Sequence, residues 1–281
     1  MTTLVLTDKV NPYSANCEAC FGICCVALPY AKSADFAFDK GGGQPCRHLQ
    51  SDYRCGIHTQ LRNKGFKGCT VYECYGAGQK VSQQLYSGND WRHSDQAEEM
   101  FQVFPVVQQL HEMLYYLHES LMIEEAESLH MDIKQIMEET EQLTLQSPAS
   151  LLKLDVHMIR GRVNDVLLKV SAIVRAPLSK AYESKRHVVK GRDYIGANLR
   201  KACLVGVSLR GVLLIGANLT EADMRRAEFI GVDMRDANLS GADLSDALFL
   251  TQAQINSAIG NKKTRLPSHL NMPSHWLATK K

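Results

Sequence analysis

The sequence has no apolar run of eighteen or more residues, almost no net charge, and no secretory start. Thirty-two basic and 30 acidic side chains give a formal net charge of +2 over 281 residues, so bulk charge does not indicate a nucleic-acid partner. Without a long apolar run, no membrane-spanning helix is expected. The first residues have no basic stretch, apolar segment or small-residue cleavage site, so we expect no signal peptide and a cytoplasmic location.

The cysteines are distributed unevenly. Eight of the nine lie between Cys17 and Cys74, and Cys203 stands alone. In a secreted mini-protein this density would predict disulfides, whereas in a reducing cytoplasm it favours metal ligands. Structural disulfides or buried thiols remain the alternative. Thiolates are soft ligands, suited to zinc, copper(I) or iron–sulfur clusters.

Cysteine spacing indicates more than one ion. Cys17 and Cys20 have the separation that clasps one ion. Cys24 and Cys25 are adjacent, and adjacent side chains of an extended chain point in opposite directions, so we expect them to serve different ions or a multinuclear cluster. Eight thiolates match two four-cysteine sites, or one or two iron–sulfur clusters. The predicted ligands are Cys17, Cys20, Cys24, Cys25, Cys46, Cys55, Cys69 and Cys74, with His48 and His58 as additional candidates.

The C-x-x-C-x-x-x-C-C start at Cys17, with its later cysteines, resembles the zinc- or iron-chelating cysteine-cluster family. In that family an Arg-Pro precedes a late cysteine and a Tyr follows an earlier one. Here Lys67-Gly68 precedes Cys69, and His58 stands in place of the Tyr. The resemblance covers residues 17–74 and implies chelation of zinc or iron, with no established reaction.

Residues 94–185 have helical periodicity. Three apolar stripes recur at spacings of three and four, which indicates packed helices. Ser94 and Ser147 are predicted N-caps, the latter followed by a proline at the first helical position. Pro105 is expected to kink the first helix or to mark its beginning. The stripes contain Val103, Val106, Leu110, Met113, Leu114, Leu117 and Leu121; then Ile123, Ala126, Leu129, Ile133 and Ile136; then Leu152, Val156, Ile159, Val163, Val166, Leu167, Val170 and Val174.

A period of five runs without a gap from Ala197 to Thr251. Every first position is Ala or Val, and every third position is large and apolar. An α-helix cannot keep such a stripe on one face, whereas a solenoid can, because each coil restarts the pattern. The third positions are Leu199, Leu204, Leu209, Leu214, Leu219, Met224, Phe229, Met234, Leu239, Leu244 and Phe249.

These ANL and ADL repeats resemble the pentapeptide-repeat family. The resemblance implies a right-handed quadrilateral β-helix with four repeats per coil, in which the first and third positions point inward. Some members imitate DNA to protect gyrase, but here the acidic side chains of the repeats are nearly matched by basic ones, and a DNA mimic needs a net negative field.

The sequence therefore predicts a multi-domain protein. A cysteine-cluster metal-binding module covers 1–90, a helical region 91–186, a pentapeptide-repeat β-helix 187–260 and a basic C-terminal tail 261–281. We expect a metal-binding adaptor or scaffold, leaning away from enzymatic activity, because no phosphate loop, G-x-S-x-G or H-E-x-x-H pattern occurs. Its partner would be a protein docked on the β-helix, or a second copy of the chain, and not a membrane or nucleic acid. The alternatives are an iron–sulfur or metal-dependent redox protein acting on a docked partner, and a redox or metal sensor.

Overall fold

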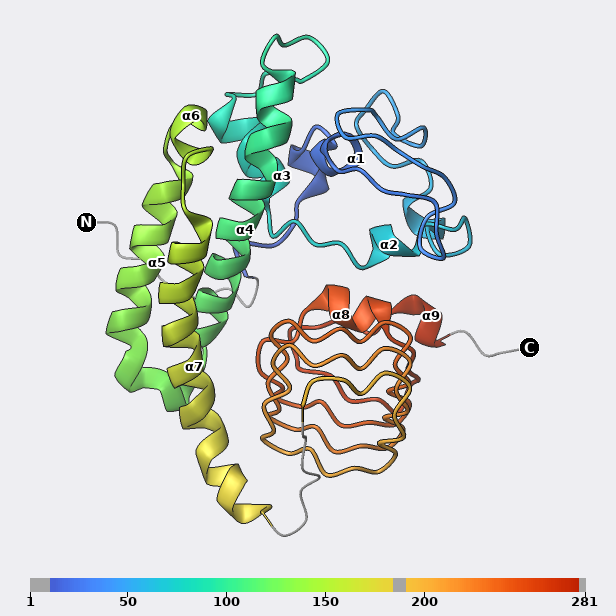
Figure 1. The fold of residues 1–281 in the computed structure, drawn as a ribbon, viewed down its shortest axis with the longest axis vertical. Helices are drawn as coiled ribbons and strands as arrows, with labels where there is room; N and C mark the ends of the chain where they lie inside the picture. Colours follow the sequence, from blue (N-terminus) through green and yellow to red (C-terminus); the bar gives the residue numbers. More distant parts are fainter. Residues whose placement is uncertain (1–10, 184–190, 278–281) are drawn as a thin grey trace. The chain divides into compact units, whose positions relative to one another are not determined.

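A computed structural model describes residues 11–183 and 191–277 of the chain (Figure 1). The chain divides into two compact units, Met1–Leu167 and Leu168–Lys281. The helix α7 begins in the first unit and ends in the second. No helix in the described ranges is long and apolar enough to cross a membrane.

The first unit consists of short helical turns in residues 11–96, here called the loop-rich segment, followed by longer helices. The turns are η1 (Cys17–Ala19), α1 (Ile23–Ala27), η2 (His58–Gln60), α2 (Lys67–Thr70), α3 (Ala77–Gln79) and the π-helical η3 (Lys80–Leu85). The longer segment contains α4 (Ala97–Leu121), η4 (Glu124–Leu129), α5 (His130–Thr144), α6 (Pro148–Leu151) and α7 (Val156–Ala181).

The helix α4 forms the centre of the first unit. Its buried stripe includes Val103, Val107, Leu110 and Leu114, all fully buried, and it packs against α5 and α6 on one side and α1 and α3 on the other. The loop-rich segment is therefore anchored on α4. His111 makes one of these links, since its Nδ1 lies 2.7 Å from the carbonyl oxygen of Tyr75.

Some local predictions for the helices were wrong. Gln96, not Ser94, is the N-cap residue of α4, and Pro105 lies inside the helix rather than at its start. Ser147 does cap a helix, but that helix is only the short α6. A break separates it from α7, and Leu152 is 40% exposed. In α4 it is Val107, not Val106, that is fully buried.

The second unit contains stacked coils of twenty residues, formed by residues 191–251 and here called the coil stack (Figure 1). Parallel bridges join residues twenty apart, such as Asn198 with Asn218 and Asn218 with Asn238. All eleven third positions of the repeat are at most 5% exposed, which confirms that these side chains point inward. One residue in five, from Gly196 to Asp246, has a positive φ of 54° to 71°, and this left-handed conformation turns the chain at each corner.

The prediction of a C-terminal β-helix was wrong for the secondary structure. Within the described ranges the chain forms no strand and no sheet, only isolated bridges of one residue pair each. The reason is the short period: a turn recurs every five residues, so a single residue on each side of a coil pairs with the next coil. Regular secondary structure in the chain is instead largely helical.

The end of the coil stack is covered by the segment that follows it. Here α8 (Gln252–Ser257) begins with a capping box between Thr251 and Gln254, and the side-chain amide of Gln254 donates to the carbonyl oxygens of Phe229 and Val232. Beyond it, Arg265 forms a further bridge with Asp243. In α9 (Ser274–Leu277), Trp276 is 4% exposed and joins the apolar core of the stack.

The last turns of α7 are tied to the coil stack by a buried carboxylate. Glu228 is fully buried and accepts hydrogen bonds from Ser208 Oγ and Arg210 Nε, each at 2.7 Å. Arg175 of α7 places its Nε 3.9 Å from the same carboxylate. Buried charge is tolerated only when it is paired in this way.

Candidate functional site

The eight clustered cysteines lie in two groups in the loop-rich segment of the first unit. The first thiol group is Cys17, Cys20, Cys24 and Cys74. The Cys24 thiol is close enough to those of Cys20 and Cys74 to interact with them electrostatically, and Cys17 interacts with Cys20 and also with Cys25. The backbone of Gly78 marks their meeting point: a Cβ there would lie 2.6 Å from Cys20 Sγ and 4.0 Å from Cys74 Sγ.

The second thiol group is Cys25, Cys46, Cys55 and Cys69. The Cys69 thiol interacts electrostatically with the other three, and Cys55 with Cys25 and Cys46. A backbone hydrogen bond links two of its members, since the amide of Cys46 donates to the carbonyl oxygen of Cys25 at 2.9 Å. Its members thus come from three separate parts of the sequence.

The boundary between the groups falls between Cys24 and Cys25. Both residues lie in the first turn of α1, and their thiols share a hydrogen bond. That hydrogen bond, together with burial, raises the pKa of Cys24, while it lowers the pKa of Cys25. Cys24 thus interacts with Cys20 and Cys74, and Cys25 with Cys55 and Cys69, although the two residues lie in a helical turn and not in the extended chain that the sequence argument assumed.

Burial raises the pKa of four of these thiols, those of Cys17, Cys55, Cys69 and Cys74. It raises the pKa of Cys74 to about 11, against which hydrogen bonds from the amides of Gly78 and Gly76 act. Because the thiolate is the reactive form, Cys17, Cys55 and Cys74 lack the lowered pKa of a redox nucleophile.

No metal site is formed by the side chains as they stand. Among residues 11–183 and 191–277, no three His, Cys, Asp or Glu side chains are arranged so that they could hold an ion. All nine cysteines have free thiols. The donor chemistry of each group fits a thiophilic metal, and metal binding by the predicted ligands stays a prediction.

The two candidate histidines have different surroundings. His48 packs edge-on against Phe66, with ring centroids 5.1 Å apart, and burial lowers its pKa. His58 is exposed at the start of η2. Cys203 lies in the second unit, where it bridges with Asp223, and so belongs to neither thiol group.

Sequence reasoning missed two side chains beside the second thiol group. The hydroxyl of Tyr30 lies 3.4 Å from Cys46 Sγ and donates a hydrogen bond to it. Lys40 is only 7% exposed, and its ammonium interacts electrostatically with Cys46 and Cys25. Neither residue stands in a recognisable motif, so only the folded structure reveals them.

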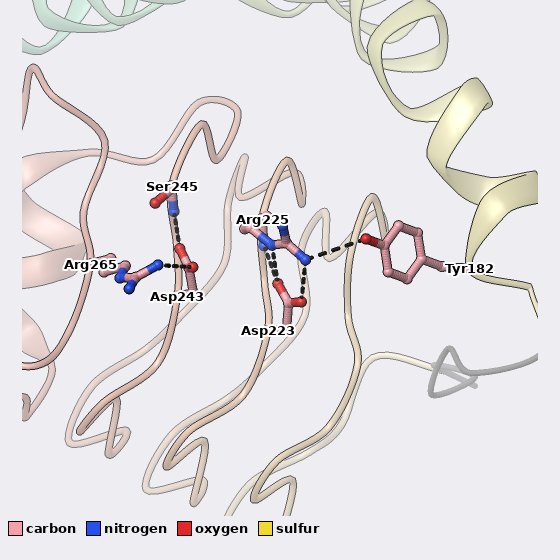
Figure 2. A network of polar contacts seen from close by, with 6 residues as sticks. All are labelled: Tyr182, Asp223, Arg225, Asp243, Ser245 and Arg265. Carbon is pink, nitrogen blue, oxygen red and sulfur yellow. Dashed lines mark hydrogen bonds and ion pairs between the residues drawn. The ribbon is translucent and has the colours of Figure 1, made fainter.

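The outer surface of the coil stack carries charges that neutralise one another. Asp223 and Asp233 pair with Arg225 and Arg235 at 2.7 and 2.8 Å. Figure 2 shows the neighbouring part of this network, in which Asp243 pairs with Arg265 at 3.3 Å and Arg225 also reaches the hydroxyl of Tyr182. Such a surface has no extended negative field of the kind that a DNA mimic needs.

Comparison with known proteins supports the repeat assignment. The family model for pentapeptide repeats matches residues 208–249. The chain is 58% identical over 275 residues to the uncharacterized protein YybG of Bacillus subtilis, an alignment that covers 97% of this chain and 98% of that protein. The family model does not reach residues 17–74, so the resemblance of that segment to a chelating family stays a prediction.

Among solved structures, the pentapeptide repeat protein Rfr23 from the cyanobacterium Cyanothece 51142 is similar to part of the chain. It is 26% identical and covers 26% of this chain and 53% of its own, with a TM-score of 0.22. At that TM-score the likeness adds nothing about the fold.

Proposed function

The chain belongs to the family of the Bacillus subtilis protein YybG and carries pentapeptide repeats, and from this premise we propose that it is an interaction scaffold whose cysteine-rich segment is held folded by bound metal. The coil stack would present the docking surface for a protein partner. The two thiol groups would each bind zinc or iron.

One observation supports the metal part of the proposal: eight thiols lie in two neighbouring groups, which also interact with each other, in a segment built of short turns. The helical turns between Cys17 and Cys74 are three to five residues long, and little of this segment is regular structure. Such segments need a source of stability other than a large core. Since a metal bound only by the folded state adds its binding free energy to folding, two four-thiolate sites would supply that stability.

Two features support a protein partner on the coil stack. Solenoids commonly use their outer faces for binding. The ion pairs on this stack leave the surface locally neutral, and a neutral surface favours neither nucleic acid nor a strongly charged ligand. We also propose a cytoplasmic location, and the free thiols of all nine cysteines are compatible with such a reducing compartment.

Elemental analysis of anaerobically purified protein, with a visible absorption spectrum, tests the metal proposal. About two zinc ions per chain without colour would support two structural sites. Iron with acid-labile sulfide and a brown chromophore would favour the iron–sulfur alternative. Protein without bound metal that takes up neither zinc nor iron would contradict both.

Chelation gives a second test. Removal of the metal should unfold the loop-rich segment, seen as protease cleavage between residues 17 and 74, while the coil stack stays folded. Trp276 lies in the stack and reports on it by fluorescence once Trp91 has been replaced. A chelated protein that resists protease throughout would count against a stabilising role of the metal.

A further inference from the structure

Lys40 carries a positive charge into the interior of the loop-rich segment. Its side chain is buried, and Nζ donates hydrogen bonds to the carbonyl oxygens of Val26 at 2.8 Å, Gln44 at 2.9 Å and Gly41 at 3.1 Å. An ammonium group has three hydrogens, so these three acceptors use its full donor capacity. The amine is thus fixed in place rather than free to rotate.

The charge of Lys40 has no carboxylate partner. Across the part of the chain that the structure describes, Lys40 forms no ion pair with Asp or Glu. Carbonyl dipoles satisfy its hydrogen bonds but supply no negative charge. Burying an unpaired ammonium is costly, so a buried lysine normally has a counter-ion.

The groups that surround Lys40 are thiols. Its ammonium interacts electrostatically most strongly with Cys46 and Cys25 of the second thiol group, then with Cys24 of the first group and Cys69 of the second. Val26, one of its three acceptors, directly follows Cys25 in α1. Lys40 is therefore built into the same loop framework that brings the second thiol group together.

Four thiolates around a divalent ion carry an excess negative charge, which a nearby buried cation would offset. We propose that Lys40 is a positioning residue for the second thiol group, a role that rests on the metal sites proposed above. When this group binds metal, the ammonium of Lys40 supplies a fixed positive charge that offsets the negative charge of the thiolates. It acts through the thiolates and does not ligate the ion.

In the first thiol group, other polar groups would offset the negative charge of the thiolates. Backbone amides of Gly76 and Gly78 donate to the Cys74 thiol, and Arg54 interacts with Cys17 at the exposed edge of the group. Lys40 interacts with only one of the four first-group thiols, Cys24. Loss of the Lys40 charge should therefore weaken one of the two sites selectively.

The test is zinc titration of the full-length reduced chain in competition with a chromophoric chelator. Lys40→Met removes the charge and nearly keeps the volume. We expect it to lower the zinc affinity of one site by about 10–100-fold, the usual effect of losing a group that supports a metal ligand, and to leave the other site unchanged. Lys32→Met is the matched control, because Lys32 is exposed in the same segment.

Lys40→Arg separates charge from packing, because it keeps the cation but not the three-carbonyl geometry. An Arg variant that retains two zinc ions while the Met variant loses one, or fails to fold, supports the counter-charge. An Arg variant as depleted as the Met variant overturns it. Equal zinc affinity in Lys40→Met and wild type would overturn the role of Lys40 alone, whereas a wild-type chain that takes up no zinc would overturn the metal proposal and this one together.

Discussion

Glu228 accepts a hydrogen bond from Arg210 Nε at 2.7 Å with no exposure of its carboxylate to solvent. Arg175 approaches the same carboxylate from α7, so one buried acid joins the helix to the coil stack. Arg210 and Ser208 belong to the coil stack and hold the carboxylate at close range, and α7 adds the second, more distant positive charge.

Replacement of Glu228 should destabilise the second unit strongly. Glu228→Ala leaves two arginines without their buried partner, and we expect a loss of about 3–5 kcal/mol in the free energy of unfolding. Urea denaturation followed by Trp276 fluorescence in a Trp91→Phe background measures it. Glu221→Ala is the control, because its ion pairs with Arg200 and Lys201 are exposed and should contribute little to stability. Equal effects of the two changes would contradict the role of the buried carboxylate.

The split between Cys24 and Cys25 predicts the pattern of metal loss in cysteine variants. Cys74→Ser should cost the ion of the first thiol group, and Cys69→Ser that of the second. Cys20→Ser combined with Cys74→Ser should lose no more metal than Cys74→Ser alone, whereas Cys69→Ser combined with Cys74→Ser should lose both ions. Metal content per chain is the measurement, and equal losses in the two double variants would show that the eight thiols act as one cluster.

Removal of the Trp276 side chain should open the end of the coil stack. Its indole donates to the carbonyl oxygen of Ala258 at 3.0 Å and lies against Gly260, where an added Cβ would approach the ring within 2.5 Å. Trp276→Ala should cost about 3–5 kcal/mol, as large aromatic truncations in cores do. Thermal unfolding followed by circular dichroism checks this. The neighbouring Leu277 is 46% exposed, so Leu277→Ala should have little effect.

The first unit should lose stability in mild acid because of His111. Burial lowers the pKa of this side chain from 6.5 to about 4. The unfolded chain therefore binds a proton before the folded one does, and stability that is complete above about pH 6.5 declines as the pH falls towards 4. The full effect corresponds to about 3 kcal/mol.

His111→Gln keeps a hydrogen-bond donor for the Tyr75 carbonyl but does not titrate, so its stability should change less between pH 7 and pH 4.5. Urea unfolding followed by the helical circular dichroism signal at both pH values is the measurement. His157→Gln, at an exposed position of α7, should keep the wild-type pH dependence. An unaltered pH dependence in His111→Gln would assign the acid sensitivity to other groups.

The five-residue period of the sequence correctly predicted which side chains of the coil stack point inward. Inward third positions such as Leu214 and Phe229 could be identified because the coil restarts every five residues. Paired strands could not be inferred correctly from the same pattern, because the corners leave one bridging residue per side. The α4 stripe was found to within one position at Val107, since its neighbour Val106 has the same apolar character.

The candidate site was predictable in composition but not in grouping. The argument that adjacent side chains point in opposite directions assumed an extended chain, whereas Cys24 and Cys25 lie in the helix α1. That Cys74 joins Cys20, and Cys69 joins Cys46, depends on how distant loops return to α1. Lys40 was beyond sequence reasoning because its burial depends on three carbonyl oxygens supplied by separate turns.

The left-handed corner at every fifth residue of the coil stack also restricts how the gene can change. Deletion of one residue would move every later corner out of line with the coil beneath it. Deletion of five would restore the corners but turn each later side by a quarter, taking Glu228 away from Ser208, its partner twenty residues earlier. Only gain or loss of twenty residues preserves both alignments, so we expect length variation within the stack to arise by duplication or loss of whole coils.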